Sequence, residues 1–230
     1  IDEISLSVKS KEKYVIIGPS GCGKSVLLKN IVGLLKPVSG EILVDWTNVI
    51  GAGRKQLGDI RKRIGFLFQH SALFDSMTIE ENLGFPLFQH TNLSYKEIRK
   101  KVDEKLEIVG MPGINNKKPS ELSGGMQKRA SLARTIILEP DYILYDEPTT
   151  GLDPIMSRVI DDLINDLNSR LGITSIVVTH DMKSAFRIAD RMGFLYGGKL
   201  ITEGTPEEIS NTDDEILKQF IQGDKPIKKI

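Results

Sequence analysis

Gly18-Pro19-Ser20-Gly21-Cys22-Gly23-Lys24-Ser25 is the stretch that decides the fold of this chain. It follows the apolar residues 14–17, which predict a strand, and precedes a helical pattern with Val26, Leu27, Ile31 and Leu34 on one side. Glycine lets the backbone curl so that several N–H groups point at one anion, and the helix N-terminus adds partial positive charge. Lys24 adds a full charge, and Ser25 can offer its hydroxyl to a magnesium ion. A glycine-rich turn that binds nothing is the alternative, but the strand–loop–helix context favours a phosphate site built from all eight residues.

The composition excludes several classes of protein. The 230 residues include 31 Lys plus Arg and 31 Asp plus Glu, so no global field favours nucleic acid. Aromatic residues make up 6%, which also argues against a base-stacking surface. Cys22 is the single cysteine, which excludes an internal disulfide and fits a reducing compartment. Because no signal peptide and no apolar run of about 20 residues is present, we expect a soluble chain that needs a partner at any membrane.

The first half of the chain carries an α/β pattern. Alternating Ile4, Leu6 and Val8 predict a half-buried strand over residues 1–8, and residues 41–45 predict another strand. Residues 54–63 are basic and polar, which is typical of a solvated helix. The apolar residues 64–68 predict a buried strand that ends at Gln69.

Between Gln69 and Ser120 only helical signals occur. Residues 78–81 and 94–97 both read as capping boxes, with a hydroxyl at the N-cap and Glu three residues later. The second box opens a helix that is closed by Gly110 and Pro112. We therefore expect a helical subdomain inserted into an α/β core.

The α/β pattern returns at residues 142–145, a buried strand that ends in Asp146 and Glu147. Residues 176–178 predict a further strand leading to His180, and residues 193–203 predict a hairpin that turns on two glycines. Residues 205–208 cap a last short helix, and the tail beyond Gly223 is expected to be loose. A helix starting at Asp153-Pro154 is expected to bury one face, formed by Ile155, Val159, Leu163, Leu167 and Leu171.

Four polar residues follow the predicted strands, and each suits phosphate chemistry. Ligand sites in open parallel sheets lie beyond the carboxyl ends of the strands. Asp146 fits a magnesium ligand, and Glu147 can orient or deprotonate an attacking water. Gln69 can hold that water or complete the metal shell, and His180 can contact a terminal phosphate. A solvated residue after a strand is the alternative for each, and for His180 alone it weighs about equally.

Residues 122–126 place Ser123, Gly124 and Gly125 ahead of a helix over residues 127–138, with Ala130 and Ala133 facing inward. This is a second anion cradle made of backbone N–H groups and a helix dipole, without a lysine. An ordinary helix start capped by Ser123 is the alternative. Since one nucleotide has one triphosphate tail, a second cradle makes sense if it covers a nucleotide held by another copy.

Together these motifs make the chain resemble the ATPases of ABC transporters along essentially its whole length. Residues 18–25 match Walker A, Gln69 the Q-loop, residues 122–126 the signature, residues 142–147 Walker B, residues 150–153 the D-loop and His180 the H-loop. Met126 and Tyr145 depart from the usual pattern, but neither removes a phosphate-contacting group.

The resemblance implies an α/β P-loop NTPase core with an inserted helical subdomain and a small N-terminal antiparallel β region. It implies ATP and Mg²⁺ as cofactors and a head-to-tail dimer that sandwiches the nucleotide. Ser25, Gln69 and Asp146 would hold the metal, and Glu147 and His180 would be catalytic. Asp153 and residues 123–125 would join the phosphate loop in binding nucleotide. The adenine-stacking aromatic is expected upstream of Ile1, where the missing initiator Met suggests further residues.

We expect a single domain over residues 1–230. Residues 1–69 and about 140–205 would form the α/β core, about 70–139 the helical subdomain with the signature, and 206–230 a C-terminal helix and tail.

The local sequence at residues 69–78, 122–126 and 151–155 is similar to that of the Mla-type ATPases of intermembrane phospholipid transport. That kinship implies phospholipid cargo, further Mla-type subunits and a place at the cytoplasmic side of the inner membrane. An importer ATPase for a small polar solute such as glycine betaine is the alternative. A non-transport ABC ATPase would need a coiled-coil insertion or a second ATPase half, and the sequence has neither.

Residues 69–88 are expected to dock on a membrane permease. They carry more large apolar groups than one small subdomain obviously needs, although some of these must form its own core. The groups are Leu73, Phe74, Met77, Phe85, Leu87 and Phe88. A separate hypothesis concerns Cys22, where Lys24 and a helix N-terminus are expected to favour the thiolate. The alternative is a small filler residue with a shielded thiol.

Overall fold

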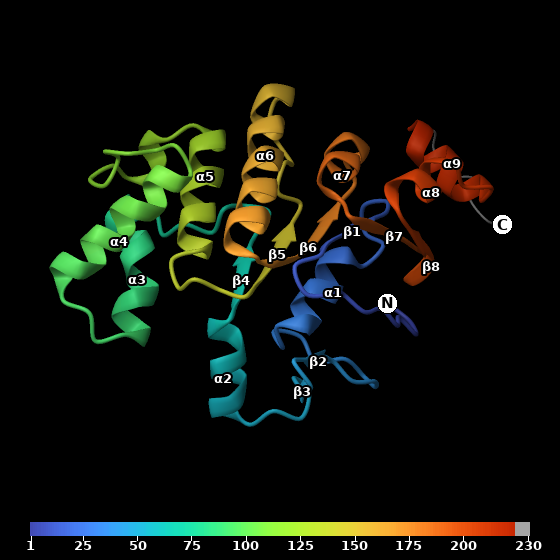
Figure 1. The fold of residues 1–230 in the computed structure, drawn as a ribbon, viewed down its shortest axis with the longest axis horizontal. Helices are drawn as coiled ribbons and strands as arrows, with labels where there is room; N and C mark the ends of the chain where they lie inside the picture. The colour runs from blue at the N-terminus through green and yellow to red at the C-terminus, as the bar shows by residue number, and fades with distance from the viewer. Residues whose placement is uncertain (224–230) are drawn as a thin grey trace.

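The computed structural model describes residues 1–223, and the tail beyond Gly223 that we expected to be loose lies outside them. A six-stranded sheet lies at the centre of the molecule (Figure 1) in the order β4-β5-β6-β1-β7-β8. All neighbours pair in parallel except β7 and β8, which form the antiparallel hairpin predicted to turn on Gly197 and Gly198. The strands are β1 (Lys13–Ile17), β4 (Ile64–Leu67), β5 (Tyr142–Asp146), β6 (Thr174–Thr179), β7 (Arg191–Tyr196) and β8 (Lys199–Gly204).

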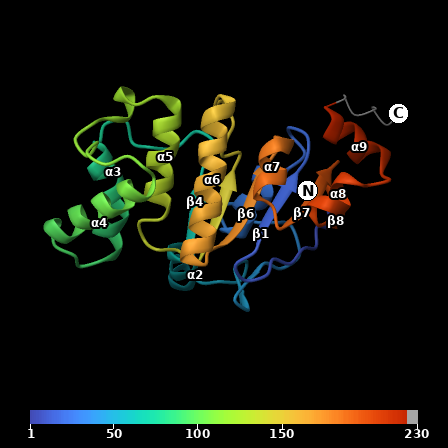
Figure 2. The same ribbon diagram turned by 45° about the horizontal axis from the view of Figure 1, so that its top comes forward.

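Three helices extend from the β4 edge of the sheet, as the helical stretch predicted (Figure 2). They are α3 (Ile79–His90), α4 (Tyr95–Ile108) and α5 (Gly124–Thr135), with a 3-10 turn, η1 (Pro119–Glu121), before α5. Both capping boxes form, since Thr78 and Ser94 each exchange hydrogen bonds with the Glu three residues on. The apolar side chains of these helices join those of β4 and β5 in one continuous cluster. The division of the chain near residues 70 and 139 stays a prediction.

Alternate residues of the central strands feed two apolar clusters, one on each face of the sheet. Val15 and Ile17 belong to the larger cluster, and Tyr14 and Ile16 belong to the smaller one. Successive side chains of a strand point to opposite faces, so both faces of the sheet are covered. The larger cluster includes side chains of α5, α6 (Pro154–Leu171) and α7 (Met182–Ile188), and the smaller includes those of α1 (Lys24–Ile31) and α2 (Arg54–Lys62).

The strand predicted over residues 1–8 is wrong. Ile4, Leu6 and Val8 do pack against the smaller cluster, which explains their alternation. Within the described part of the chain, however, the stretch makes one backbone-to-backbone hydrogen bond, from Asp2 N–H to the Gly198 carbonyl at 2.8 Å. A strand also needs a partner ladder, which a local pattern cannot reveal. The antiparallel β region is reduced to β2 (Leu43–Val44) and β3 (Thr47–Asn48), shorter than the strand predicted over residues 41–45.

The helix α6 and the C-terminal helices differ from the prediction. The start and end of α6 match the prediction, and Leu167 of the predicted face is buried. Ile155 and Leu171 are 77% and 48% exposed, however, and Ile160 and Ile164 form the rest of the buried apolar face. Packing against the sheet and α7 selects that face, and the spacing of apolar residues within the helix does not reveal this packing. The helix α8 (Pro206–Ser210) carries the predicted cap but is followed by an unpredicted helix, α9 (Glu215–Gln222), whose Leu217 is buried. Among the described residues, no helix is long and apolar enough to cross a membrane.

Candidate functional site

The phosphate loop joins β1 to α1 and lies at the carboxyl end of the sheet. Gly23, the N-cap of α1, is left-handed with a φ of 108° and provides no side-chain cap. The first N–H groups of a helix have no intrahelical partner, so here they can serve an anion. At Gly18 the backbone passes so close to β7 that an added Cβ would lie 2.2 Å from the Leu195 carbonyl oxygen, which excludes any side chain. The loop therefore fits the phosphates of a nucleotide.

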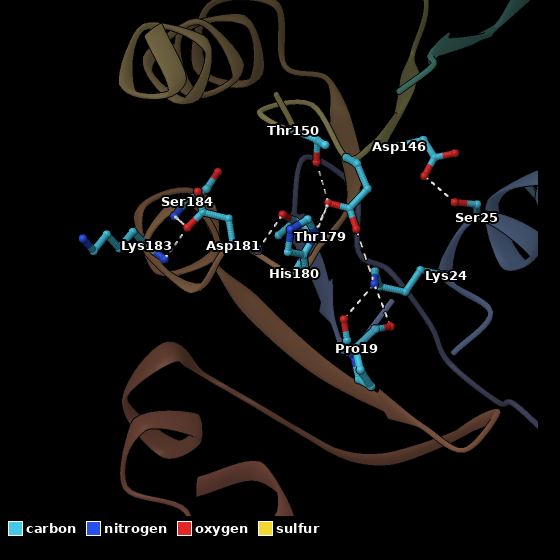
Figure 3. A network of polar contacts seen from close by, with 12 residues as sticks. Pro19, Lys24, Ser25, Asp146, Thr150, Thr179, His180, Asp181, Lys183 and Ser184 are labelled. Atoms are coloured by element: carbon cyan, nitrogen blue, oxygen red, sulfur yellow. Dashed lines mark hydrogen bonds and ion pairs between the residues drawn. The ribbon is translucent and has the colours of Figure 1, made fainter. Parts of the chain in front are cut away.

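The Lys24 side chain holds the phosphate loop in place. Its side chain is buried, and Nζ donates to the carbonyl oxygens of Gly18 at 2.7 Å and Pro19 at 3.2 Å (Figure 3). The same nitrogen forms an ion pair with Glu147 Oε1 at 3.3 Å. A buried ammonium needs such partners because burial of a charge is costly. Lys24 thus sets a positive charge between the phosphate loop and the end of β5.

Ser25 and Asp146 meet at the position expected for a magnesium ion. Ser25 Oγ donates to Asp146 Oδ1 at 2.6 Å, across the gap between α1 and β5 (Figure 3). Mg²⁺ prefers oxygen ligands and usually takes only one or two protein groups beside water and phosphate. Across residues 1–223 no group of three or more His, Cys, Asp or Glu side chains forms a metal cage. The hydroxyl and the carboxylate therefore fit a magnesium shared with a nucleotide.

Glu147 lies at the junction of three elements. Its φ of 50° is left-handed, which is unusual for a residue with a side chain and is typical of functional sites. Its N–H donates to the Val178 carbonyl of β6 at 3.0 Å, which holds the turn in place. Oε2 accepts from Thr150 Oγ1 at 3.2 Å and lies 2.9 Å from His180 Nδ1. Together with Lys24 on Oε1, these contacts hold the carboxylate in one orientation, as a general base requires.

Gln69 follows β4, and the structure links it to α5 through its backbone. Lys128 Nζ donates to the Gln69 carbonyl at 2.5 Å and to the Phe68 carbonyl at 3.3 Å. Within the described residues the Gln69 side chain makes no hydrogen bond to Ser25 or Asp146, so its metal role stays a prediction. Burial lowers the pKa of Lys128 to about 8, while Asp146 and Glu147 act in the opposite direction. Sequence reasoning missed Lys128, because a lone lysine in a helix usually indicates an exposed position.

Ser123, Gly124 and Gly125 form the start of α5 and pack on the start of α6. Ser123 Oγ accepts from Met126 N–H at 3.4 Å, and an added Cβ on Gly125 would lie 2.7 Å from Met156 Cε. Asp153 caps α6 by accepting from the N–H groups of residues 155 and 156. In the described part of the chain no hydrogen bond or ion pair joins this group to the phosphate loop. One copy therefore does not bring the two predicted anion cradles together.

The thiolate predicted for Cys22 is wrong. Burial raises the pKa of the Cys22 thiol above its ordinary value, and the opposing effect of Lys24 is smaller. Cys22 packs against the smaller apolar cluster, and its Sγ would lie 2.9 Å from a Cβ placed on Gly18. The side chain therefore fills space within the loop.

Alkylation of Cys22 by iodoacetamide at neutral pH is expected to be slower than that of an exposed cysteine in a short peptide. The thiolate is the nucleophile, and the raised pKa keeps the thiol protonated. The rate should rise with pH, with a midpoint above that of the peptide, and the alkylated protein should lose ATP binding. Mass spectrometry of the modified protein across a pH series measures this. Faster alkylation than the peptide at neutral pH would show that the loop does stabilise the thiolate.

Comparison with known proteins identifies the family. A family model described as "ABC transporter" matches residues 1–150. The intermembrane phospholipid transport ATP-binding protein MlaF of Haemophilus influenzae is 45% identical over 99% of this chain and 87% of its own length. That of Escherichia coli K12 is 44% identical over 96% of the chain and 82% of its own length. A probable ribonucleotide transport ATP-binding protein, mkl of Mycobacterium leprae, is 43% identical over 96% of the chain, which spans 64% of that relative's length.

Solved structures share the fold. The dimeric post-hydrolysis state of the ATP-binding cassette MJ0796 bound to ADP and phosphate has a TM-score of 0.81 at 36% identity, covering 87% of this chain and 88% of that one. Clostridium perfringens cbiO1, part of the transporter complex cbiONQ, has a TM-score of 0.83 at 34% identity, covering 94% of this chain and 86% of that one. These similarities confirm the α/β fold class expected from the motifs. Because the family match alone spans well over half of its 230 residues, the chain belongs to the ABC transporter family.

Proposed function

We propose that this protein is the ATP-binding and ATP-hydrolysing subunit of a transporter that moves phospholipid between membranes. The observation that carries the enzymatic part is the meeting of Lys24, Glu147 and His180 beside the Ser25–Asp146 pair. A phosphate loop, a metal-binding pair and an oriented carboxylate at one sheet edge are what phosphoryl transfer to water requires.

Each part of this site has one task in the proposal. The backbone of residues 18–25 and Lys24 would bind the ATP phosphates, and Ser25, Asp146 and Gln69 would hold Mg²⁺. When bound, Mg²⁺ would neutralise charge on the phosphate oxygens. Glu147 accepts a proton from the attacking water, and Thr150 and His180 keep its carboxylate oriented.

A second copy completes the nucleotide site in the proposal. Residues 123–125 and Asp153 of one copy would cover the nucleotide bound by the phosphate loop of the other. The separation of the two cradles within one chain supports this, as does the dimeric state of the similar MJ0796 cassette. The N–H groups at the start of α5 would then serve the partner's phosphates.

The phospholipid cargo is supported by 44–45% identity to MlaF proteins over nearly the whole chain. Transport of a polar solute is the second candidate, because the mkl relative is named for ribonucleotide transport and is 43% identical. The test is ATP turnover by the protein assembled with its native membrane partner in vesicles. Stimulation by added phospholipid supports the proposal, and stimulation by ribonucleotide or another polar solute alone supports the second candidate.

The docking surface on the membrane partner is proposed at α3 and the loop before it. Phe74, Phe85 and Phe88 are 45%, 37% and 52% exposed, whereas Leu87 is buried in the core of the subdomain. Phe74 and Phe85 stack edge to face at 5.6 Å, which forms one apolar patch. Exposed aromatic groups of this kind mark protein interfaces. Such docking would hold the protein at the cytoplasmic side of the inner membrane.

Phe74→Glu is expected to weaken binding to the membrane partner by about 30-fold or more, the scale of losing one buried aromatic anchor. The charge would be buried in the interface, whereas ATP binding should be unchanged because Phe74 lies outside the nucleotide site. Trp46→Glu is the control, since Trp46 is 93% exposed on the β2–β3 hairpin. Co-purification of each variant with the membrane partner measures the effect. Wild-type binding by a folded Phe74→Glu protein would contradict this docking surface.

A further inference from the structure

One face of α5 carries polar side chains where the core would accept apolar ones. Lys128, Ser131 and Arg134 are spaced three residues apart, so they lie on one side of the helix. Lys128 is 4% exposed and Ser131 is 1% exposed. The helix that carries them begins at residues 123–125, which we assign to the nucleotide of a second copy.

All three side chains hold the loop after β4. Lys128 Nζ donates to the carbonyl oxygens of Phe68 and Gln69, at 3.3 Å and 2.5 Å. Ser131 Oγ and Arg134 both donate to the Ser71 carbonyl, at 2.5 Å and 3.4 Å. We call these contacts the α5 clamp. The clamp joins segments about 60 residues apart in sequence, which only the tertiary structure brings together.

The loop that the clamp holds has an unfavourable backbone. Ser71 and Ala72 are both left-handed, with φ of 53° and 52°. Residues with a side chain rarely adopt this conformation, and it persists only when surrounding contacts over-determine it. The clamp supplies such contacts on the side that faces α5.

Lys128 is the costliest member of the clamp. Lysine is almost never fully buried unless it is paired, and across the described residues Lys128 forms no ion pair within 4 Å, although the charges of Asp146 and Glu147 favour its ammonium. Its hydrogen-bond acceptors are two neutral carbonyls, those of Phe68 and Gln69, at the start of the loop after β4, which we call the Gln69 loop. A methionine would fill about the same space without the free-energy cost of burying a charge. The ammonium therefore serves the position of the loop rather than packing.

The clamp also reaches the proposed docking surface. The Arg134 guanidinium lies 5.7 Å from the centre of the Phe74 ring, a cation–π contact. The single helix α5 therefore contacts the start of α6, the backbone at Gln69 and, through Phe74, the proposed docking surface.

We propose that Lys128 is a positioning residue, which fixes the backbone at Gln69 to α5 so that Gln69 and residues 123–125 move as one body. It acts on hydrolysis through Gln69 and through the seating of α5 on a second copy. The inference rests on the proposed ATPase function. Loss of the ammonium would leave the phosphate loop intact but allow the Gln69 loop to move independently of α5.

The test compares Lys128→Met, Lys128→Arg and the control Lys96→Met, which alters an exposed lysine of α4. Lys128→Met is expected to lower kcat for ATP hydrolysis by about 10-fold, the scale of losing a hydrogen bond from a charged donor. KM should stay within about two-fold, because the phosphate loop sets ground-state binding. Lys128→Arg should recover most of the activity, and Lys96→Met should match the wild type. Hydrogen exchange should accelerate over residues 68–74 in Lys128→Met alone.

The outcomes separate this inference from the proposed function. A wild-type protein that does not hydrolyse ATP contradicts the proposed function and the positioning role with it. An active wild type with unchanged kcat in folded Lys128→Met contradicts the positioning role alone, as does a loss that Lys128→Arg does not recover. If Lys128→Met does not fold, Ser131→Ala removes one bond to the same loop and should lower kcat at unchanged KM. Unchanged kcat in that variant overturns the inference.

Discussion

Glu147→Gln is expected to lower kcat for ATP hydrolysis by about 10²–10⁴-fold, the usual contribution of a general base. The amide keeps the size of the side chain but cannot accept a proton from water. It can still contact Thr150 and His180, so the fold should be preserved. ATP binding should survive, and the ATP-bound dimer should live longer because its hydrolysis is slow.

Phosphate release under saturating ATP measures this effect, with nucleotide binding measured on the same preparation. Glu107→Gln is the control, since Glu107 is an exposed residue of α4 away from the site. Turnover of Glu147→Gln within a few-fold of the wild type would contradict the role given to Glu147. Loss of both turnover and binding would instead indicate a structural role for the ion pair with Lys24.

Lys24→Ala is expected to weaken ATP binding by about 10–100-fold, which corresponds to the roughly 1.5–3 kcal/mol of hydrogen bonds to a charged group. The change removes the positive charge of the phosphate loop and its two bonds to the loop carbonyls. It also leaves Glu147 Oε1 without its ion-pair partner. Titration with a fluorescent ATP analogue measures the dissociation constant.

Lys29→Ala provides the matched control on the same helix, because Lys29 lies in the last turn of α1, away from the loop. Its affinity for ATP should equal that of the wild type. A dissociation constant for folded Lys24→Ala within about two-fold of the wild type would mean that the loop binds nucleotide through its backbone alone.

Local pattern was sufficient to predict the parts of the site that lie next to strand ends. The strand before Gly18, the helix that begins at Lys24 and the strand that ends at Asp146 all form where the apolar runs and glycines predict them. These signals are short-range, because period-two alternation and caps depend on neighbouring residues. The convergence of Lys24, Asp146 and Glu147 then follows from parallel pairing, which brings the carboxyl ends of strands to one edge.

Properties that depend on distant residues were the ones missed. Ile4, Leu6 and Val8 alternate like a strand but find no ladder in the described chain. In the sequence Lys128 resembles a surface lysine, but in the folded protein it is buried and bonded to the loop at Gln69. At Cys22, burial outweighs the nearby charge of Lys24, and burial cannot be read from a motif.

The nucleotide that remains on the protein after incubation with Mg-ATP tests the central claim most directly. Chromatography of the bound nucleotide should find ADP on the wild type, intact ATP on Glu147→Gln and little nucleotide on Lys24→Ala. Glu147→Gln with intact ATP should also sediment as a particle of two copies. Intact ATP on the wild type after prolonged incubation, or ADP formed on Glu147→Gln at the wild-type rate, would contradict the assignment of this site as an ATPase centre built on Lys24 and Glu147.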